Sequence, residues 1–126
     1  GYSGKAFTDI VCIGVGGSNL GPEMVTEALP KKESDPVSLH YISSVDAVPL
    51  EQLLAGLSAE TTLFIVSSKT FTTTETLLNA SACKTWLLNV ASLAAVAQHF
   101  VAITVAVEKA VAFGLTESHC FKIWDP

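Results

Sequence analysis

The stretch that decides the fold is DIVCIGVGGSNLGPEM, residues 9–24, in which an apolar run of strand length ends directly in a glycine-rich turn. Gly16 and Gly17 allow the backbone to turn sharply and to approach a ligand without obstruction by a Cβ atom. Helical sequence follows, with Pro22 expected in the first helical turn, where its missing N–H group has no intrahelical partner. The free N–H groups at the start of such a helix suit an anion.

Apolar runs of strand length recur along the chain and alternate with helical sequence. Strands are predicted at 9–15, 38–43, 62–68, 100–105 and 120–124, and helices at 22–29, 49–57, 108–113 and within 72–99, where residues 89–92 are expected to separate two helices. Such strands, separated by helices, predict an α/β fold: a doubly wound, five-stranded parallel sheet with helices on both faces. We expect residues 1–126 to form one domain.

Ligands of open parallel sheets bind at the carboxyl ends of the strands, where the strand order reverses. In the flavodoxin-like order 2-1-3-4-5 this reversal lies between the first and third strands, so the loops after Val15 and Val66 are expected to form the site. The second of these loops, SSKTFTTTET at 67–76, has seven Ser or Thr residues among its ten. Its hydroxyl groups and the charge of Lys69 suit a phosphomonoester. The alternative is a capping box in which Thr72 and Glu75 only cap the following helix.

Nucleotide-binding patterns fit this sequence poorly. Gly14-x-Gly16-x-x-Asn19 lacks the third glycine of the dinucleotide fingerprint. Gly16 and Gly21 have the spacing of a P-loop, but Pro22 stands where that motif needs lysine. Both departures count against a nucleotide as the ligand of the glycine turn.

Composition excludes several classes of partner. The net charge is −5, and the seven Lys and Arg residues are scattered, so nucleic acid is not expected as a partner. The three cysteines are far apart and match neither a disulfide framework nor a metal site, which indicates a reducing, cytoplasmic setting. No apolar run is long enough to cross a membrane, and GYSGKAFTD at 1–9 lacks the order of a signal peptide.

The remaining polar candidates are assigned structural roles. His40, His99 and His119 lie in or beside predicted strands without partners at metal-ligand spacing. Asp46 and Glu51 follow the second strand, where turn and helix-start roles are more common than ribose binding. We expect no metal ion at any of these positions.

Four segments together carry a family resemblance: DIVCIGVGGSNLGPEMVTEAL at 9–29, LFIVSSKTFTTTETLLNA at 63–80, HFVAITVAVEKAVAFG at 99–114, and IWD at 123–125. They closely resemble the first sugar-isomerase (SIS) domain of the glucose-6-phosphate isomerase family, over nearly the whole chain. The resemblance implies that the turn binds the sugar phosphate through Gly17 and Ser18. It also implies that the SKTFTT segment grips the phosphate through Ser68, Lys69, Thr70, Phe71, Thr72 and Thr73.

Two further positions carry expectations from the same resemblance. Glu75 matches an acidic residue that supports the active-site histidine of the family. Asn19 stands where the family often has Asp, a change that we expect to alter hydrogen bonding in the turn without abolishing binding.

The resemblance further implies a cytoplasmic enzyme of glycolysis and gluconeogenesis that interconverts glucose 6-phosphate and fructose 6-phosphate through an enediol, without metal or organic cofactor. Family members are homodimers. Their GGR arginine, glutamate base, ring-opening histidine and C-terminal lysine lie in sequence beyond residue 126. We therefore expect this chain to be a phosphate-binding part that is inactive alone.

Two alternatives stay open from the sequence. One is a stand-alone, non-catalytic module that senses phosphosugars, and the other is an excised domain relevant only to folding or assembly. Trp86 and Trp124 are expected to anchor the core or an interface, and the surface where a second domain would dock is expected to promote self-association.

Overall fold

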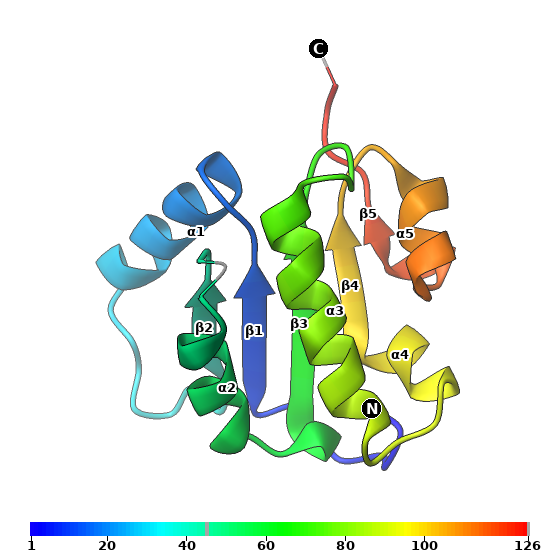
Figure 1. Ribbon diagram of the computed structural model, residues 1–126. Coiled ribbons are helices and arrows are strands. Elements are labelled where there is room, and N and C mark those ends of the chain that lie inside the picture. Colours follow the sequence, from blue (N-terminus) through cyan, green and yellow to red (C-terminus); the bar gives the residue numbers. More distant parts are fainter. Residues whose placement is uncertain (45, 126) are drawn as a thin grey trace.

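A computed structural model describes residues 1–44 and 46–125 and contains one five-stranded parallel sheet (Figure 1). The strand order β2-β1-β3-β4-β5 confirms the predicted fold. The carboxyl ends of the strands lie at the top of Figure 1. The strands are β1 (Asp9–Ile13), β2 (Ser38–Ile42), β3 (Thr62–Ser67), β4 (Phe100–Ile103) and β5 (Cys120–Phe121).

Helices connect the strands, as the alternation in the sequence predicts. They are α1 (Gly17–Ala28), α2 (Ala47–Ala55), α3 (Thr74–Leu88), α4 (Ala94–His99) and α5 (Val107–Phe113), with 3₁₀ turns η1 (Ala59–Thr61) and η2 (Glu117–His119). The predicted division of the long helical segment is confirmed, because α3 ends at Leu88 and α4 begins at Ala94. In the described part of the chain, no helix has the length and apolar character needed to cross a membrane.

The hydrophobic core lies between one face of the sheet and helices α2 to α5. Burial alternates along the strands, as expected when successive side chains point to opposite faces. Phe64 and Phe100 stack in its centre with their ring centroids 4.9 Å apart. The strand residues of this face include Val11, Ile13, Phe64, Val66, Phe100 and Ala102, and each is at most 1% exposed.

Helix α1 packs on the opposite face. Thr26 Oγ1 lies 2.6 Å from Tyr41 Oη on β2, and Tyr41 is level in the sheet with Cys12. The next residues of that row, Ile65 and Val101, are half-buried, in contrast to the fully buried core face. The two faces of the sheet are therefore covered unequally.

Several predicted bounds are wrong by one or two residues, and those of α1 and β5 are wrong by more. Helix α1 begins at Gly17 instead of residue 22, so Pro22 lies inside the helix and not in its first turn. Gly16, with φ 55° and ψ −128°, turns the chain early enough for the N–H group of Leu20 to bond to Gly16 O at 2.9 Å. Strand β5 ends at Phe121 instead of residue 124, because its neighbour β4 leaves the sheet after Ile103.

Candidate functional site

The loops that follow β1 and β3 leave neighbouring strands at the top edge of the sheet, where the strand order reverses (Figure 1). We call residues 14–18 the glycine turn and residues 67–73 the hydroxyl loop. A Cβ atom at Gly14 would lie 3.1 Å from Ser18 Cβ and 3.3 Å from Ser67 O. Such distances are tighter than ordinary contacts, so a glycine at position 14 lets the turn pack directly against the loop.

The glycine turn presents backbone donors at the start of α1. Gly16, Gly17 and Ser18 are exposed, and the Ser18 N–H group bonds to Val15 O at 3.2 Å. Among the described residues, the N–H groups of Gly16 and Gly17 find no backbone acceptor. Two donors and the Ser18 hydroxyl therefore remain available where the helix dipole favours an anion.

Asn19 is buried behind the turn, with 4% of its surface exposed. Its Nδ2 donates to Glu23 Oε2 at 2.9 Å, and its Oδ1 has no partner among the described residues. An aspartate at position 19 would set two carboxylates against each other unless one were protonated. In this chain the amide of Asn19 donates to Glu23, a hydrogen bond that an ionised aspartate at this position could not donate.

The hydroxyl loop is held in a strained conformation by a buried aromatic anchor. Phe71 has φ 51°, in the left-handed region that costs a bulky residue roughly 1–2 kcal/mol. Its side chain is only 3% exposed and packs edge-on against Phe113 of α5, with ring centroids 5.9 Å apart. Burial of this ring offsets the strain and fixes the turn that the Phe71 N–H group closes on Ser68 O.

The loop hydroxyls pair with one another instead of capping α3. Ser68 Oγ lies 3.1 Å from Thr73 Oγ1, and Thr70 Oγ1 lies 2.6 Å from Thr72 Oγ1. The alternative, a capping box of Thr72 and Glu75, is not formed, because the N-cap is Thr73 and its side chain makes no capping hydrogen bond. The first N–H groups of α3 consequently stay available to an external acceptor.

The hydroxyl loop carries one positive charge of its own, and α5 supplies a second. Lys69 is exposed, and its Nζ lies 2.7 Å from Asp125 Oδ1 in the C-terminal tail. Lys109 Nζ, in the first turn of α5, donates to Thr70 O at 3.4 Å. Glu75 is exposed in the first turn of α3, where a carboxylate interacts favourably with the helix dipole.

Sequence alone pointed neither to Lys109 nor to a second residue of this region, Thr104. It is 0% exposed, and its Oγ1 donates to Lys69 O at 2.9 Å while accepting from the Ala106 N–H group at 3.1 Å. The sequence feature that could have indicated Thr104 is its position as the single hydroxyl residue in the apolar run FVAITV at 100–105. The structure thus adds a buried support beneath the predicted loop.

Comparison with known proteins places these loops in a family. The family described as "Phosphoglucose isomerase" matches residues 1–126. The chain belongs to the phosphoglucose isomerase family. It is 53% identical over 126 residues to "Glucose-6-phosphate isomerase 1" of Colwellia psychrerythraea and 49% identical over 126 residues to "Glucose-6-phosphate isomerase" of Pseudoalteromonas translucida. These alignments cover 99% of this chain and 23% of each relative, so the chain spans about a quarter of their length.

Solved structures agree with this membership. The crystal structure of a glucose-6-phosphate isomerase from Chlamydia trachomatis superposes with a TM-score of 0.75 at 30% sequence identity. The match covers 94% of this chain and 22% of that one. Both the fold and the membership of the phosphoglucose isomerase family are therefore supported by sequence and by structure.

The three histidines have structural partners at other places in this family fold. His40 Nε2 lies 2.9 Å from Asp9 Oδ1. This hydrogen bond is the main reason why the pKa of Asp9 is lower than usual. His119 Nδ1 lies 2.7 Å from Ala97 O. Asp46 caps α2 by accepting from the Val48 N–H group at 3.1 Å. The structural roles expected for these side chains are confirmed.

His99 is completely buried near the amino ends of the strands. Its Nδ1 lies 2.7 Å from Thr62 O, and its Nε2 accepts from the Tyr2 N–H group at 3.1 Å. Burial lowers the pKa of His99 below its usual range, and the amino terminus lowers it further. The imidazole therefore ties the N-terminal segment to β3, at the end of the sheet opposite the two loops.

Cysteine and tryptophan side chains add no reactive group to the two loops. Cys83 is in the core, where burial raises the pKa of its thiol to about 12 and leaves it un-ionised. Trp86 packs edge-on against Phe64, as expected of a core anchor. Trp124 is 85% exposed in the tail and belongs to no core of this chain.

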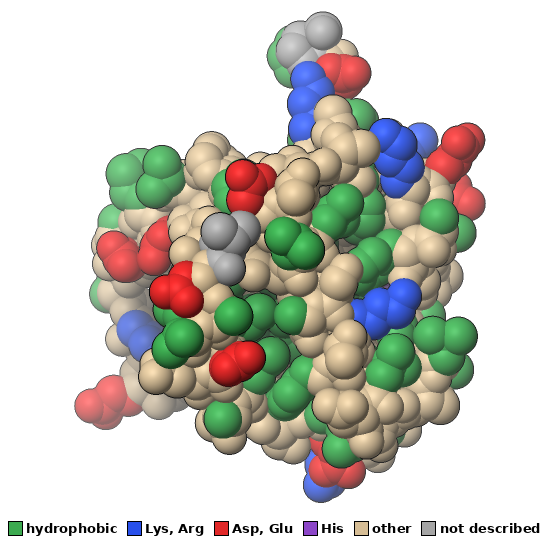
Figure 2. All heavy atoms as spheres, in the orientation of Figure 1, with side chains coloured by type: hydrophobic (Ala, Val, Ile, Leu, Met, Phe, Trp, Pro, Cys, Tyr) green, Lys and Arg blue, Asp and Glu red, His purple; other side chains and the backbone are tan. Residues whose placement is uncertain are grey.

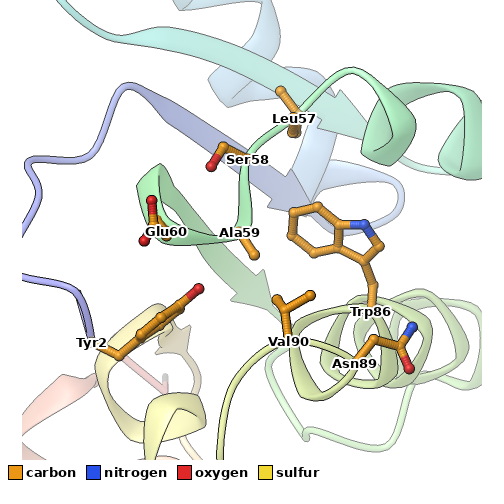
Figure 3. Close-up of a pocket in the computed structure, with 8 residues that line it drawn as sticks. All are labelled: Tyr2, Leu57, Ser58, Ala59, Glu60, Trp86, Asn89 and Val90. Carbon is orange, nitrogen blue, oxygen red and sulfur yellow. The ribbon is translucent and has the colours of Figure 1, made fainter.

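A hollow of about 460 Å³ lies away from the two loops, beside η1 at the amino ends of the strands. In Figure 3, Trp86 and Val90 face Tyr2 and Ala59 across it. The only charged side chain in its lining is Glu60, which pairs with Lys5. Because a carboxylate repels a phosphate, this hollow is poorly suited to bind an anion despite its volume.

A second depression runs between α2 and α3. Figure 2 shows apolar side chains gathered over these two helices, where Leu50, Leu54, Leu78 and Trp86 line the groove. Its lining contains Glu51 and no Lys or Arg. The groove is suited to apolar contact and lacks the positive charge that a phosphate group requires.

Proposed function

We propose that this chain is the phosphosugar-binding SIS domain of a glucose-6-phosphate isomerase and that residues 1–126 form that domain. The observation that carries the proposal is the meeting of the glycine turn and the hydroxyl loop at the strand-order reversal. Open parallel sheets bind ligands at this point. Membership of the phosphoglucose isomerase family supports a phosphosugar as the ligand class.

The two loops supply complementary donors to a phosphate dianion. Gly17 and Ser18 provide a backbone N–H group and a hydroxyl at the start of α1. In the hydroxyl loop, the N–H groups of Lys69, Thr70, Thr72 and Thr73 bond to no other described residue, and Lys69 adds a positive charge. Charge-assisted hydrogen bonds of this kind are about twice as strong as neutral ones. We assign phosphate binding to Gly17, Ser18, Ser68, Lys69, Thr70, Phe71, Thr72 and Thr73.

Phe71 has a different role from the other assigned residues. Its ring is buried against Phe113, so only its backbone is placed to face a ligand. Its left-handed conformation bends the loop between Thr70 and Thr72. We infer that Phe71 shapes the phosphate-binding turn, whereas its neighbours donate the hydrogen bonds.

We propose that the whole protein interconverts glucose 6-phosphate and fructose 6-phosphate. This reaction moves a proton between C1 and C2 of the sugar through an enediol and needs a base, an acid for ring opening and a cation near the developing oxyanion. The chain supplies the phosphate anchor, and the exposed carboxylate of Glu75 is proposed to orient a histidine from elsewhere in the protein. The proton transfer leaves the oxidation state of the substrate and product pair unchanged overall, so we propose no cofactor.

The remaining proposals concern the quaternary structure and the cellular location of the protein. The half-buried row Cys12, Ile65 and Val101 and the exposed α1 residues Leu20 and Met24 offer apolar surface to a second subunit or a further part of the protein. We propose a homodimeric parent on this basis. The free state of all three cysteines supports a reducing, cytoplasmic setting.

The second candidate function is a non-catalytic module that senses phosphosugars with the same loops. Such a module would have the same binding site as the isomerase domain, and only the sequence joined to the domain would differ. An isomerase gene should continue beyond residue 126 into a GGR motif and a second α/β domain. Sequencing of the parent gene therefore separates the two functions.

Binding and turnover can be tested on the 126-residue chain. The ³¹P signal of glucose 6-phosphate is expected to broaden saturably when the chain is added, and inorganic phosphate should compete. NAD serves as the nucleotide control and should compete weakly or not at all. A coupled isomerase assay is expected to show no turnover, and an unaffected ³¹P signal at high protein concentration would contradict phosphosugar binding.

A further inference from the structure

We infer that Thr104 is a positioning residue that sets the shape of the hydroxyl loop and thereby its affinity for phosphate. Thr104 follows β4 and lies beneath the loop, where it is completely buried. This inference rests on the proposed function, because it concerns the same phosphate site. It assigns no contact between Thr104 and the ligand.

Both hydrogen-bonding functions of the Thr104 hydroxyl are used. The Oγ1 atom accepts from the Ala106 N–H group at 3.1 Å, a local turn that orients the hydroxyl. Its proton is then directed to Lys69 O, 2.9 Å away. The same carbonyl accepts from the Val105 N–H group at 3.0 Å, so two donors from one segment fix Lys69.

This anchorage continues on either side of Lys69. The Ser68 N–H group donates to Ile103 O at 3.1 Å, which extends the pairing of β3 with β4 into the loop. On the other side, the Phe71 ring packs against Phe113 of α5. The segment from β4 to α5 therefore holds the loop at Ser68, Lys69 and Phe71, and the Thr104 hydroxyl provides the side-chain hydrogen bond to Lys69 O.

A hydroxyl at this position matters because the loop conformation is strained. Phe71 occupies the left-handed region, which an untethered loop would leave. With Lys69 O fixed to Thr104, the N–H groups of Lys69 and Thr70 stay available for an anion instead of turning to internal acceptors. Thr104 thus lowers the ordering cost of binding by holding the loop in its binding shape before the ligand arrives.

Thr104→Val removes the hydroxyl with little change in shape, and Thr104→Ser retains it. The matched control is Thr62→Val, because Thr62 is also 0% exposed and donates its hydroxyl to a carbonyl, Ser58 O at 2.7 Å, at the opposite end of the sheet. We expect Thr104→Val to weaken binding of glucose 6-phosphate about tenfold, as loss of one buried hydrogen bond predicts. Thr104→Ser and Thr62→Val should bind like the unaltered chain.

A second readout separates this inference from the proposed function. Backbone ¹⁵N order parameters at Thr70 and Thr72 are expected to fall in Thr104→Val without ligand and to be unchanged in the other two variants. If the unaltered chain binds no glucose 6-phosphate, the proposed function fails, and the order parameters alone decide whether Thr104 holds the loop. Equal affinity and equal order parameters in Thr104→Val and the unaltered chain would overturn the inference. If Thr104→Val does not fold, Thr104→Cys, which keeps a weak donor, should give intermediate values, and unaltered values would overturn it.

Discussion

Lys69 Nζ lies 2.7 Å from Asp125 Oδ1, so the ammonium of the hydroxyl loop is paired with a carboxylate of the C-terminal tail. Both side chains are about half exposed. Exposed ion pairs contribute at most about 1 kcal/mol, so a phosphate can displace this carboxylate. We therefore expect the pair to lower the affinity for an anion without closing the site.

Asp125→Asn is expected to strengthen binding of glucose 6-phosphate by about two- to fivefold, because the incoming phosphate no longer competes with a carboxylate. Titration calorimetry at low salt measures the change. Glu33→Gln, an equal charge change at an exposed position between α1 and β2, is the control. Equal gains in the two variants would assign the effect to net charge instead of the pair.

Lys69→Ala is expected to weaken phosphate binding by about 1–3 kcal/mol, the range for loss of a charge-assisted hydrogen bond. Lys32→Ala removes the same charge from an exposed site between α1 and β2 and should have little effect. Dissociation constants for inorganic phosphate and glucose 6-phosphate provide the comparison. An unchanged constant in Lys69→Ala would remove this side chain from the site.

Gly14→Ala is expected to lower the free energy of unfolding by about 1–3 kcal/mol, the usual cost of overpacking. The new Cβ atom would press on Ser18 and on Ser67 O, between the glycine turn and the hydroxyl loop. Gly21→Ala is the control, because its Cβ atom would meet open space within α1. That change should raise stability by about 0.5–1 kcal/mol. Urea unfolding of both variants measures the two changes in free energy, and equal changes would contradict the tight contact at Gly14.

Burial of His99 predicts that the chain loses stability in mild acid. Because the pKa of His99 is lower in the folded chain than in the unfolded chain, the unfolded chain binds the proton first as the pH falls. The stability that comes from neutral His99 is fully present above the usual histidine pKa of about 6.5. It is lost as the pH falls towards the lower pKa that His99 has in the folded chain. The uptake of one proton changes the free energy of unfolding by at most about 1.4 kcal/mol per pH unit.

Urea unfolding at pH 7.5 and pH 5.5 tests this dependence. His99→Gln keeps a side chain that can bond to Thr62 O and removes the titrating group. The variant should be less stable than the unaltered chain at pH 7.5 and should lose less stability on acidification. A variant that loses as much stability as the unaltered chain would show that another group causes the acid sensitivity.

The sequence predicts the strand order and the two loops because local patterns decide them. Apolar runs such as 9–15 and 62–68 mark buried strands, and the hydroxyl residues at 67–73 stand directly after one of them. Parallel strands connected by helices then bring Gly14 and Ser67 to the same edge. These predictions needed no long-range contact to be known in advance.

Other features depend on contacts that are distant in the sequence. The left-handed conformation of Phe71 is stabilised by Phe113, and the orientation of Lys69 depends on Thr104. The pattern Thr72-x-x-Glu75 is typical of a capping box, but the hydroxyl of Thr72 pairs with Thr70 instead, and the N-cap is Thr73. Local pattern therefore locates the hydroxyl loop, whereas its conformation is set by β4 and α5.

The most direct test of the central claim is a titration of the ¹⁵N-labelled 126-residue chain with glucose 6-phosphate, monitored by amide chemical shifts. We expect saturable shifts in Gly16 to Asn19 and Ser67 to Thr74, in the turn and the loop at the strand-order reversal. NAD at the same concentrations should leave these amides unchanged. Saturable shifts confined to other residues, or no shifts at all, would contradict a preformed phosphosugar site in this chain.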